Sequence, residues 1–463
     1  MMDRGLNKEI LRLSLPSILA NITVPLVGMV DTAVAGHLPA ADGCSAAGFI
    51  GAISVGSMLF SLLYWSFGFL RTGTGGLTAQ AFGRGDFREC GRIFARGTGL
   101  ALAVAAAVIL LQWPYLKLVL FCTQGTAEVE ELAARYFFIR IWAAPATLSL
   151  MTFRGWFVGM QDSMRSMWAD LVVNAVNIAA SIVLSMGIGS WQGLGFDGIA
   201  LGTVIAQYSG LLYCTLATAF RYGSKVFSLL DRDALASLWE RGVMRWYMRM
   251  NLDYFGRSVF FMVIYIGYTA IAARYGDMAL AASSIMMQLL MLFSYFTDGF
   301  AYAGEALTGR FIGAEDLRMT RLSVRYVFAW SMAIAVVSVG LYQILGGPLV
   351  RLMTDDADVA GYCMKFLPWL ILMPPLGCAA FFWDGIYLGA TASRQMFLAM
   401  MGAAIAFLGV WFLCRLFILP GFPADGAAAI HCLLGAYFAH LLVRTVWLSV
   451  RYRRDIIARH FGI

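Results

Sequence analysis

An aspartate inside the first apolar stretch is the strongest candidate for chemistry in this chain. Asp31 follows an apolar run over residues 13–30, and a charged side chain within a membrane is costly unless it is paired. Asn174 and Asn177 are three residues apart, so a helix places both on one face, and Ser181 follows one turn later. Amides and hydroxyls suit a carboxylate that must be stable both protonated and ionised. These residues predict a shared polar site around a carboxylate that can change its charge.

Two more hydroxyls and two prolines could complete this site. Thr203 and Tyr136 lie in other apolar stretches and could join the cluster. Pro25 lacks an amide hydrogen, so the helix can bend just below Asp31, and Pro16 is a second hinge candidate. The alternative for each Asn and Thr alone is a hydrogen bond that only joins two helices.

Five other charges in apolar stretches have a different pattern. Arg154 and Asp384 occupy equivalent positions of an internal repeat, and we expect a salt bridge between them. Asp298 and Glu305 are seven residues apart and share a helix face, while Arg257 lies near a helix start. Charges near helix ends can reach water, so structural or gating roles are expected for all five.

The elements that must position these residues are membrane helices. Hydrophobic residues make up 60% of the chain, charged residues only 13%, and the mean hydropathy is +0.74, which indicates a bilayer protein. Stretches of roughly 20 apolar residues predict twelve spans and an all-α membrane fold. They lie near residues 13–36, 47–70, 97–120, 133–156, 167–188, 198–220, 254–274, 279–302, 322–345, 362–386, 396–419 and 427–449.

The second half of the chain repeats the first at an offset of 230 residues. The paired residues include Pro145 and Pro375, Gly155 and Gly385, Gly159 and Gly389, and Asp86 and Asp316. Two such halves, each with six helices, indicate pseudo-symmetric lobes of the kind found in transporters. We expect an N-terminal lobe over residues 1–220, a cytoplasmic linker over 221–250 and a C-terminal lobe over 251–463.

Cations mark one side of the predicted membrane. Lys and Arg gather before the first span, in alternate loops, in the linker and in the basic tail, whereas loops such as 37–46, 187–197 and 420–426 carry none. This pattern predicts an inner-membrane protein with both termini in the cytoplasm. The net charge of +7 therefore reflects topology, and we expect no nucleic-acid partner.

Several other chemistries have no signal. No Gly-Lys pair, HExxH or GxSxG motif occurs, and the eight cysteines and four histidines show no metal-ligand spacing. We therefore expect no enzyme activity, no cofactor and no resident metal. Sodium at Asp31 is the one metal-binding alternative.

The motifs and their order resemble the DinF-like branch of the multidrug and toxic compound extrusion (MATE) transporters. They begin with Asp31-Thr32-Ala33-Val34-Ala35-Gly36-His37 and Tyr136-Phe137-Phe138-Ile139-Arg140, and continue through Arg154-Gly155, Asp298-Gly299-Phe300-Ala301-Tyr302 and Asp384-Gly385. The resemblance covers nearly the whole chain. It implies a V-shaped pair of six-helix lobes that exports drugs or other amphipathic compounds by alternating access, in exchange for protons or sodium.

The resemblance also implies roles for three residues. Asp31 matches the family's cation-coupling carboxylate, Asn177 its fifth-helix asparagine and Thr203 its sixth-helix threonine. Some relatives carry a second aspartate where this chain has Ser181, so a two-carboxylate site is not expected here. Proton coupling is favoured over sodium, because a lone carboxylate with amide neighbours suits a proton.

The sequence leaves two alternative functions, a flippase and an intramembrane enzyme. A lipid-linked saccharide flippase of the same superfamily would need several deep cations, but the chain offers chiefly Arg140, Arg257 and Arg415. An intramembrane enzyme would need a paired carboxylate or a nucleophile beside Asp31, and the first half shows no acidic partner. The expected partners are small amphipathic or cationic organic substrates and membrane lipids, and the expected state is a monomer.

Overall fold

The protein is described here by a computed structural model, which covers residues 4–38, 46–123, 126–229, 237–421 and 426–462. Within these residues, twelve helical stretches are long and apolar enough to cross a membrane. Short links join the helices, and no strand occurs in the described ranges. The predicted all-α membrane fold is confirmed.

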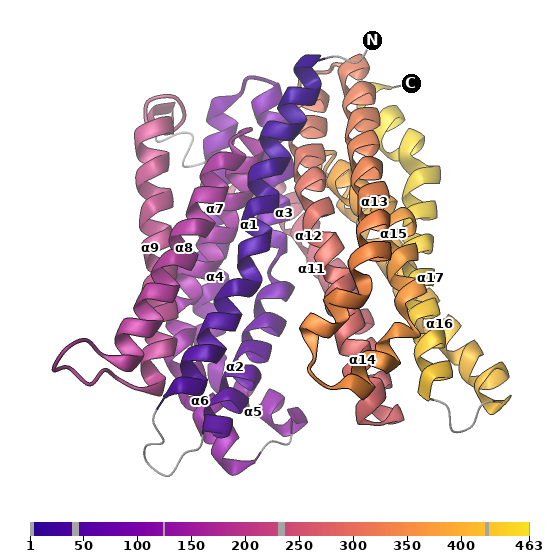
Figure 1. The fold of residues 1–463 in the computed structure, drawn as a ribbon. Helices are drawn as coiled ribbons and strands as arrows, with labels where there is room; N and C mark the ends of the chain where they lie inside the picture. Colours follow the sequence, from indigo (N-terminus) through magenta and orange to yellow (C-terminus); the bar gives the residue numbers. More distant parts are fainter. Residues whose placement is uncertain (1–3, 39–45, 124–125, 230–236, 422–425, 463) are drawn as a thin grey trace. The chain divides into compact units, whose positions relative to one another are not determined.

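The first nine helices cover the first half of the chain (Figure 1). They are α1 (Arg4–His37), α2 (Ala46–Ser66), α3 (Phe69–Gly83), α4 (Phe87–Leu110), α5 (Gln112–Thr123), α6 (Ala127–Arg140), α7 (Ala144–Gly159), α8 (Ser163–Met186) and α9 (Phe196–Tyr222). The third span begins ten residues before its predicted start at residue 97, because Asp86 caps the helix by accepting a hydrogen bond from the Glu89 amide.

The remaining helices begin at Arg241, inside the predicted linker over residues 221–250. They are α11 (Arg241–Ala272), α12 (Asp277–Gly313), α13 (Leu317–Met353), α14 (Ala357–Met364), α15 (Leu367–Gly389), α16 (Ser393–Phe417), α17 (Gly426–Tyr452) and α18 (Arg459–Phe461). Linker residues 230–236, which include Asp231 and Asp233, lie outside the described residues.

The helices form two compact units. The N-terminal unit is Leu19–Arg245, and the C-terminal unit combines Met1–Ile18 with Trp246–Ile463. This division differs from the predicted lobe boundaries, which place all of the first helix in the first lobe. The start of α1 packs in the C-terminal unit because Glu9 pairs with Arg310 at 2.8 Å and the Trp330 indole donates to Asn7 at 2.9 Å.

The two chain ends belong to the same unit. Both lie at one end of the C-terminal unit, where α1 begins and α18 ends (Figure 1). An even number of spans returns the chain to the side on which it started.

Close helix contacts explain the repeated glycines. A Cβ atom added to Gly155 on α7 would collide with the carbonyl oxygen of Arg71 on α3, and one added to Gly385 on α15 would collide with that of Ala301 on α12. Arg71 and Ala301 are themselves 230 residues apart. Each unit therefore contains the same close helix pair, which only glycine permits.

The turns repeat as well. Gln161 and Thr391, at equivalent positions, both adopt positive φ, of 62° and 52°. Asp316 caps α13 by accepting a hydrogen bond from the Met319 amide, as Asp86 does at α4. The duplication inferred from the sequence is thus present in the backbone of both units.

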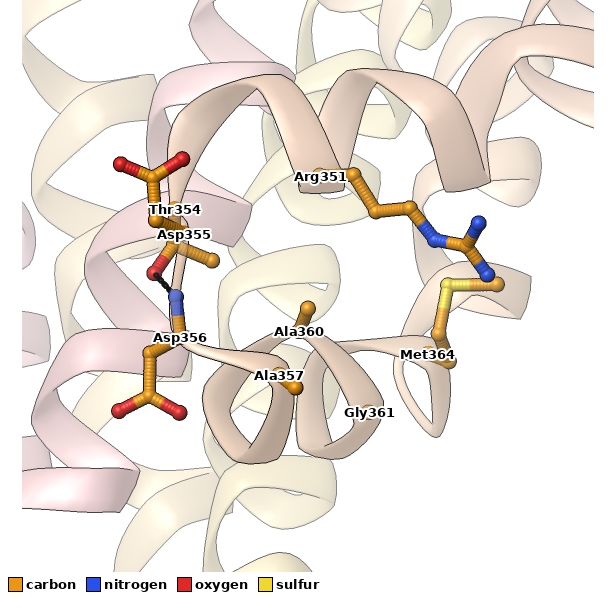
Figure 2. Close-up of a pocket in the computed structure, with 8 residues that line it drawn as sticks. All are labelled: Arg351, Thr354, Asp355, Asp356, Ala357, Ala360, Gly361 and Met364. Carbon is orange, nitrogen blue, oxygen red and sulfur yellow. Dashed lines mark hydrogen bonds between the residues drawn. The ribbon is translucent and has the colours of Figure 1, made fainter.

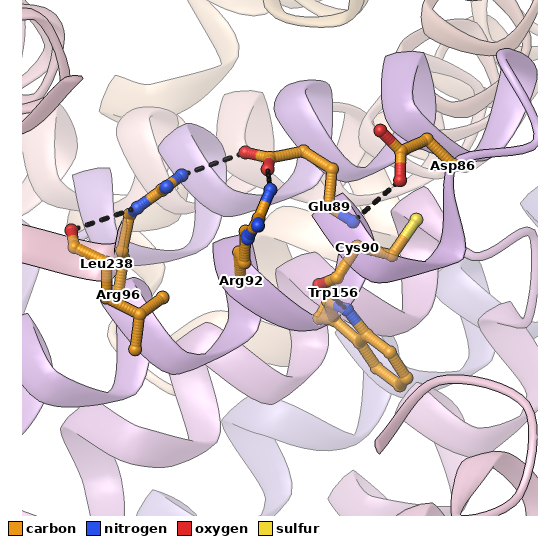
Figure 3. Close-up of polar contacts among 7 residues, drawn as sticks. All are labelled: Asp86, Glu89, Cys90, Arg92, Arg96, Trp156 and Leu238. Atoms are coloured by element: carbon orange, nitrogen blue, oxygen red, sulfur yellow. Dashed lines mark hydrogen bonds and ion pairs between the residues drawn. The ribbon is translucent and has the colours of Figure 1, made fainter. Parts of the chain in front are cut away.

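A polar network fastens the basic end of α4 in the N-terminal unit (Figure 3). Arg96 Nη1 lies 2.8 Å from Glu89 Oε1, and Arg96 Nε donates to the Leu238 carbonyl at 3.3 Å. The Trp156 indole of α7 donates to the Cys90 carbonyl at 3.0 Å. The Arg96 bond attaches Leu238 of the linker to α4, and the Trp156 bond attaches α7 to the same helix.

Candidate functional site

The site in the N-terminal unit is built around the carboxylate of Asp31 on α1. Asp31 is buried, with 5% of its side chain exposed. Ser181 on α8 is fully buried, and its hydroxyl donates to Asp31 Oδ1 at 3.1 Å. The two residues that sequence reasoning set side by side are therefore in direct contact. Ser181 supplies a neutral donor to the carboxylate.

Asn177 and Thr203 form the next layer of the site. Asn177 lies one turn before Ser181 on α8, and its amide nitrogen donates to Thr203 Oγ1 on α9 at 3.0 Å. Its Oδ1 atom is buried and accepts no hydrogen bond in the described part of the chain. The site thus contains an oxygen that is available to a proton donor or a cation.

Glycine allows α9 to reach this layer. A Cβ atom on Gly202, the residue before Thr203, would lie 2.7 Å from the Ser181 amide nitrogen and 2.8 Å from its hydroxyl oxygen. The small residue brings the two helix backbones together at the depth of the site. Sequence reasoning missed Gly202, because many glycines in apolar helices serve only packing.

Arg140 on α6 carries the only guanidinium that interacts electrostatically with Asp31 among the described residues. Tyr136 lies one turn earlier on the same helix. The Tyr136 hydroxyl is fully buried and accepts a hydrogen bond from Arg140 Nη1 at 2.7 Å. The Arg140 guanidinium also lies 4.7 Å above the Phe60 ring, a favourable cation–π position. Asp31 therefore senses a positive charge that a tyrosine and an aromatic ring hold in place.

Asn174 does not join the Asp31 hydrogen bonds. Its amide nitrogen donates to Thr23 Oγ1 at 2.7 Å, and Thr23 donates to the Ala20 carbonyl at 2.7 Å. Asn174 thus attaches α8 to α1 two turns before Asp31, which matches the alternative of a helix-joining hydrogen bond. Thr23 was missed, because a lone threonine in an apolar helix usually bonds to its own backbone, as it also does here.

The two hinge candidates lie within one continuous helix. Pro16 is buried and Pro25 is exposed, and α1 runs from Arg4 to His37 through both. A bend of this helix at Pro25 during transport stays a prediction.

The predicted salt bridge between Arg154 and Asp384 is wrong. Arg154 on α7 pairs with Asp170 on α8 at 2.5 Å. Asp384 on α15 pairs with Arg257 on α11 at 2.5 Å and with Arg444 on α17 at 3.0 Å. Each charge finds an opposite charge inside its own unit, where pairing offsets the cost of burial.

Asp298 and Glu305 on α12 lie near the same charged region of the C-terminal unit. Glu305 is fully buried and interacts electrostatically with Tyr254, and Asp298 does so with Arg444. Sequence reasoning overlooked Arg444 and Asp170. Both are ionisable residues inside predicted spans, so the rule that singled out Asp31 would have found them.

The structure offers oxygen ligands but no cluster typical of a transition metal. No group of three or more His, Cys, Asp or Glu that could hold a metal occurs in the described ranges. Near Asp31 the donors are a carboxylate, an amide oxygen and two hydroxyls, the oxygen types that suit a hard cation such as sodium. The same groups suit a proton on Asp31.

A cavity lies elsewhere, at the junction of α13 and α14 (Figure 2). It has a volume of about 440 Å³ and is lined by Arg351, Thr354, Asp355 and Asp356 among others. Asp356 caps α14 by accepting hydrogen bonds from the amides of Asp358 and Val359. None of the residues predicted for the coupling site lines this cavity.

Sequence comparison identifies relatives across both halves. The MatE family profile matches residues 16–183 and again 255–412, one match in each repeat. DNA damage-inducible protein F of Escherichia coli (strain K12) is 33% identical over 403 residues, which cover 87% of this chain and 84% of the relative. A protein of Bradyrhizobium diazoefficiens named "Probable multidrug resistance protein NorM" is 25% identical over 442 residues, which cover 92% and 88%.

Solved structures share the fold. A multidrug resistance MATE family transporter of the MOP superfamily, in its outward-facing conformation, superposes with a TM-score of 0.82 at 15% identity, covering 97% of this chain and 98% of the other. A MATE crystal structure in the bent conformation gives a TM-score of 0.79 at 15% identity, again covering 97% and 98%.

Proposed function

Because this chain belongs to the MatE family of multi-pass membrane transporters, we propose that it exports small organic compounds in exchange for a cation. Two of the similar proteins are named for multidrug resistance, one of them as a transporter. The observation that carries the coupling role is the buried contact between Asp31 and Ser181, beside an amide oxygen that accepts no hydrogen bond in the described ranges.

Protonation of Asp31 would change the forces between three helices. Ionised Asp31 accepts a hydrogen bond from the Ser181 hydroxyl and attracts the Arg140 guanidinium. Protonated Asp31 loses the attraction to Arg140, and its new hydrogen can be donated to a nearby oxygen. The contacts that connect α1 to α8 and α6 therefore differ between the two states. A bend of α1 at Pro25 would turn this difference into alternating access.

One proton supplies enough energy for this exchange. A charge that crosses about 100 mV gains about 2.3 kcal/mol. At about 1.4 kcal/mol per tenfold ratio, this supports a roughly fifty-fold gradient of a neutral substrate. A single coupling carboxylate is therefore sufficient. Proton coupling is favoured over sodium because the site has one carboxylate and no ion pair at Asp31 among the described residues.

Pairing of the deep cations argues against the flippase. Arg140 is bonded to Tyr136 and Arg257 to Asp384, while Arg415 is exposed. A lipid-linked saccharide would need several of these cations to bind its phosphates within the membrane. We further propose that both termini face the cytoplasm and that the basic ends of the spans mark that side.

The test is dye efflux from liposomes that contain the purified protein. A pH gradient and a sodium gradient are imposed separately on the wild type, Asp31→Asn and Asp277→Asn. Asp277 is exposed at the start of α12, so its variant makes the same chemical change away from the site. We expect efflux that follows the pH gradient in the wild type and in Asp277→Asn, and none in Asp31→Asn. Gradient-driven efflux by Asp31→Asn would refute the coupling role.

A further inference from the structure

A small basic cavity lies in the C-terminal unit, where α11 and α16 begin and α18 ends the described chain. Its volume is about 210 Å³, roughly seven times the share of one molecule in liquid water. The residues that matter here are Trp246, Arg249, Asp253, Ser393, Arg394 and Arg459. All belong to the same compact unit.

The cavity carries an excess of positive charge. Arg249, Arg394 and Arg459 bring three guanidinium groups to it, and Asp253 brings one carboxylate. Asp253 is engaged on both oxygens, since Oδ2 accepts from the Ser393 hydroxyl at 3.0 Å and Oδ1 lies 3.5 Å from Arg394 Nη1. Asp253 offsets one guanidinium, and Asp455 interacts electrostatically with Arg459. The three lining arginines still outnumber these two carboxylates, so the cavity favours an anion with oxygens that can accept several N–H donors.

The repeat in the other unit places a carboxylate at the equivalent position. Asp162 precedes α8, where it accepts a hydrogen bond from the Tyr222 hydroxyl and pairs with Arg165, both at 2.8 Å. The equivalent residue before α16 is Ala392, which has no polar side chain. The N-terminus of a helix attracts anions. The second repeat therefore has the same helix start at Ser393, but an arginine, Arg394, where the first repeat has Met164, and no carboxylate at residue 392.

The surroundings indicate an anion attached to a lipid. On α11, Trp246, Met248 and Leu252 have 47%, 45% and 67% of their side chains exposed, next to Arg249. Tryptophan and arginine gather where spans meet the headgroup layer, with apolar side chains toward the bilayer. A ligand bound here can place its phosphate among the arginines and its chains along α11.

We propose that this cavity binds the phosphate headgroup of an anionic phospholipid in the leaflet at the basic ends of the spans. Basic pockets between membrane helices recognise such headgroups. The site is separate from Asp31, and the proposal does not depend on the coupling role of that residue. The cavity lies at the basic ends of the spans, whereas a flippase would need cations deep within the membrane.

Native mass spectrometry of the full chain tests the proposal, with short-chain phosphatidylglycerol as the probe. The variant Arg394→Gln/Arg459→Gln removes two cavity charges. The matched control Arg321→Gln/Arg325→Gln removes two exposed arginines of α13, which do not line the cavity. We expect the cavity variant to bind the probe about thirtyfold more weakly and the control to bind as the wild type does. Equal binding by all three proteins would overturn the proposal.

A second variant fills the position with a carboxylate. Ala392→Asp gives α16 the residue that α8 has, and aspartate is a favoured residue at a helix start. Ala392 is buried, with 1% of its surface exposed, and adjoins the lining residues Thr391 and Ser393. We expect the variant to have a lower thermal unfolding temperature without lipid and to lose phosphatidylglycerol binding below that temperature. Retained binding in this folded variant would count against the site.

Competition distinguishes a lipid from a soluble anion. We expect that neither phosphatidylcholine, which has no net charge, nor millimolar inorganic phosphate displaces the probe. Displacement by inorganic phosphate would assign the cavity to a soluble anion and overturn the lipid proposal. Displacement by phosphatidylcholine would overturn the preference for an anionic lipid.

Discussion

The two units treat a membrane-embedded aspartate in opposite ways. In the N-terminal unit, Asp31 accepts a hydrogen bond from the neutral hydroxyl of Ser181, and Arg140 acts on it electrostatically. In the C-terminal unit, two arginines, Arg257 and Arg444, both pair with Asp384. Asp384 is therefore held by two guanidinium groups, whereas the hydrogen-bond partner of Asp31 is a neutral hydroxyl.

This difference teaches how a duplicated fold can divide its tasks. Both units retain the same close glycine contacts and capped turns, so the scaffold tolerates either arrangement of charge. A cation-coupled step needs a group that changes its charge, while a rigid unit benefits from charges that do not change. We infer that the N-terminal unit carries the coupling. The charge cluster of the C-terminal unit stabilises the fold of that unit.

The largest expected effect is the loss of coupling on Asp31→Asn. The amide fits the space of the carboxylate but cannot gain and lose a proton, so gradient-driven efflux should fall to the level of liposomes without protein. The unfolding temperature should change little, because Ser181 can still donate to the side-chain oxygen. A large loss of stability in this variant would contradict a coupling role separate from folding.

The next effect is destabilisation by Asp384→Asn. It leaves Arg257 and Arg444 without their carboxylate, and removing one partner of a buried ion pair costs about 3–5 kcal/mol. The prediction is checked by thermal unfolding in detergent. The variant Asp384→Asn/Arg257→Gln removes one of the surplus charges and should recover part of the loss. A stable Asp384→Asn protein with uncoupled transport would reverse the comparison between the units.

A smaller and symmetric effect is expected at the repeated glycines. Gly155→Ala and Gly385→Ala each place a Cβ against a backbone carbonyl of the partner helix, and overpacking costs about 1–3 kcal/mol. Both variants should lower the unfolding temperature by similar amounts. Gly409→Ala is the control, since nothing lies within 4 Å of its added Cβ. Unequal losses would show that the two helix pairs do not contribute alike.

The smallest effect belongs to Ser181→Ala. It removes one hydrogen bond to Asp31, worth about 1 kcal/mol on average and more for a charged acceptor. We expect slower but still gradient-dependent efflux, with a rate roughly five to thirty times lower. The measurement is the initial rate of dye efflux. Ser181→Thr keeps the hydroxyl and should retain more activity than Ser181→Ala.

The sequence by itself determined the fold class and half of the site. Apolar stretches of membrane length follow from composition, because a bilayer demands helices with internal backbone bonds, and all twelve predicted spans are present among the described residues. Asp31 was found because an ionisable group in such a stretch is costly. The spacing of Asn174, Asn177 and Ser181 placed these polar residues on one face of a second helix, as suitable partners for the carboxylate.

Only the tertiary structure decided which charges and amides meet. Whether Arg154 pairs with Asp384 or Asp170, and whether Asn174 bonds to Thr23 or joins Asp31, depends on the angles and depths at which helices pack. Spacing along one helix says which residues share a face, but it does not say which residue of another helix faces them. Pairing between helices is a property of three-dimensional packing, and many different pairings are compatible with the same apolar pattern.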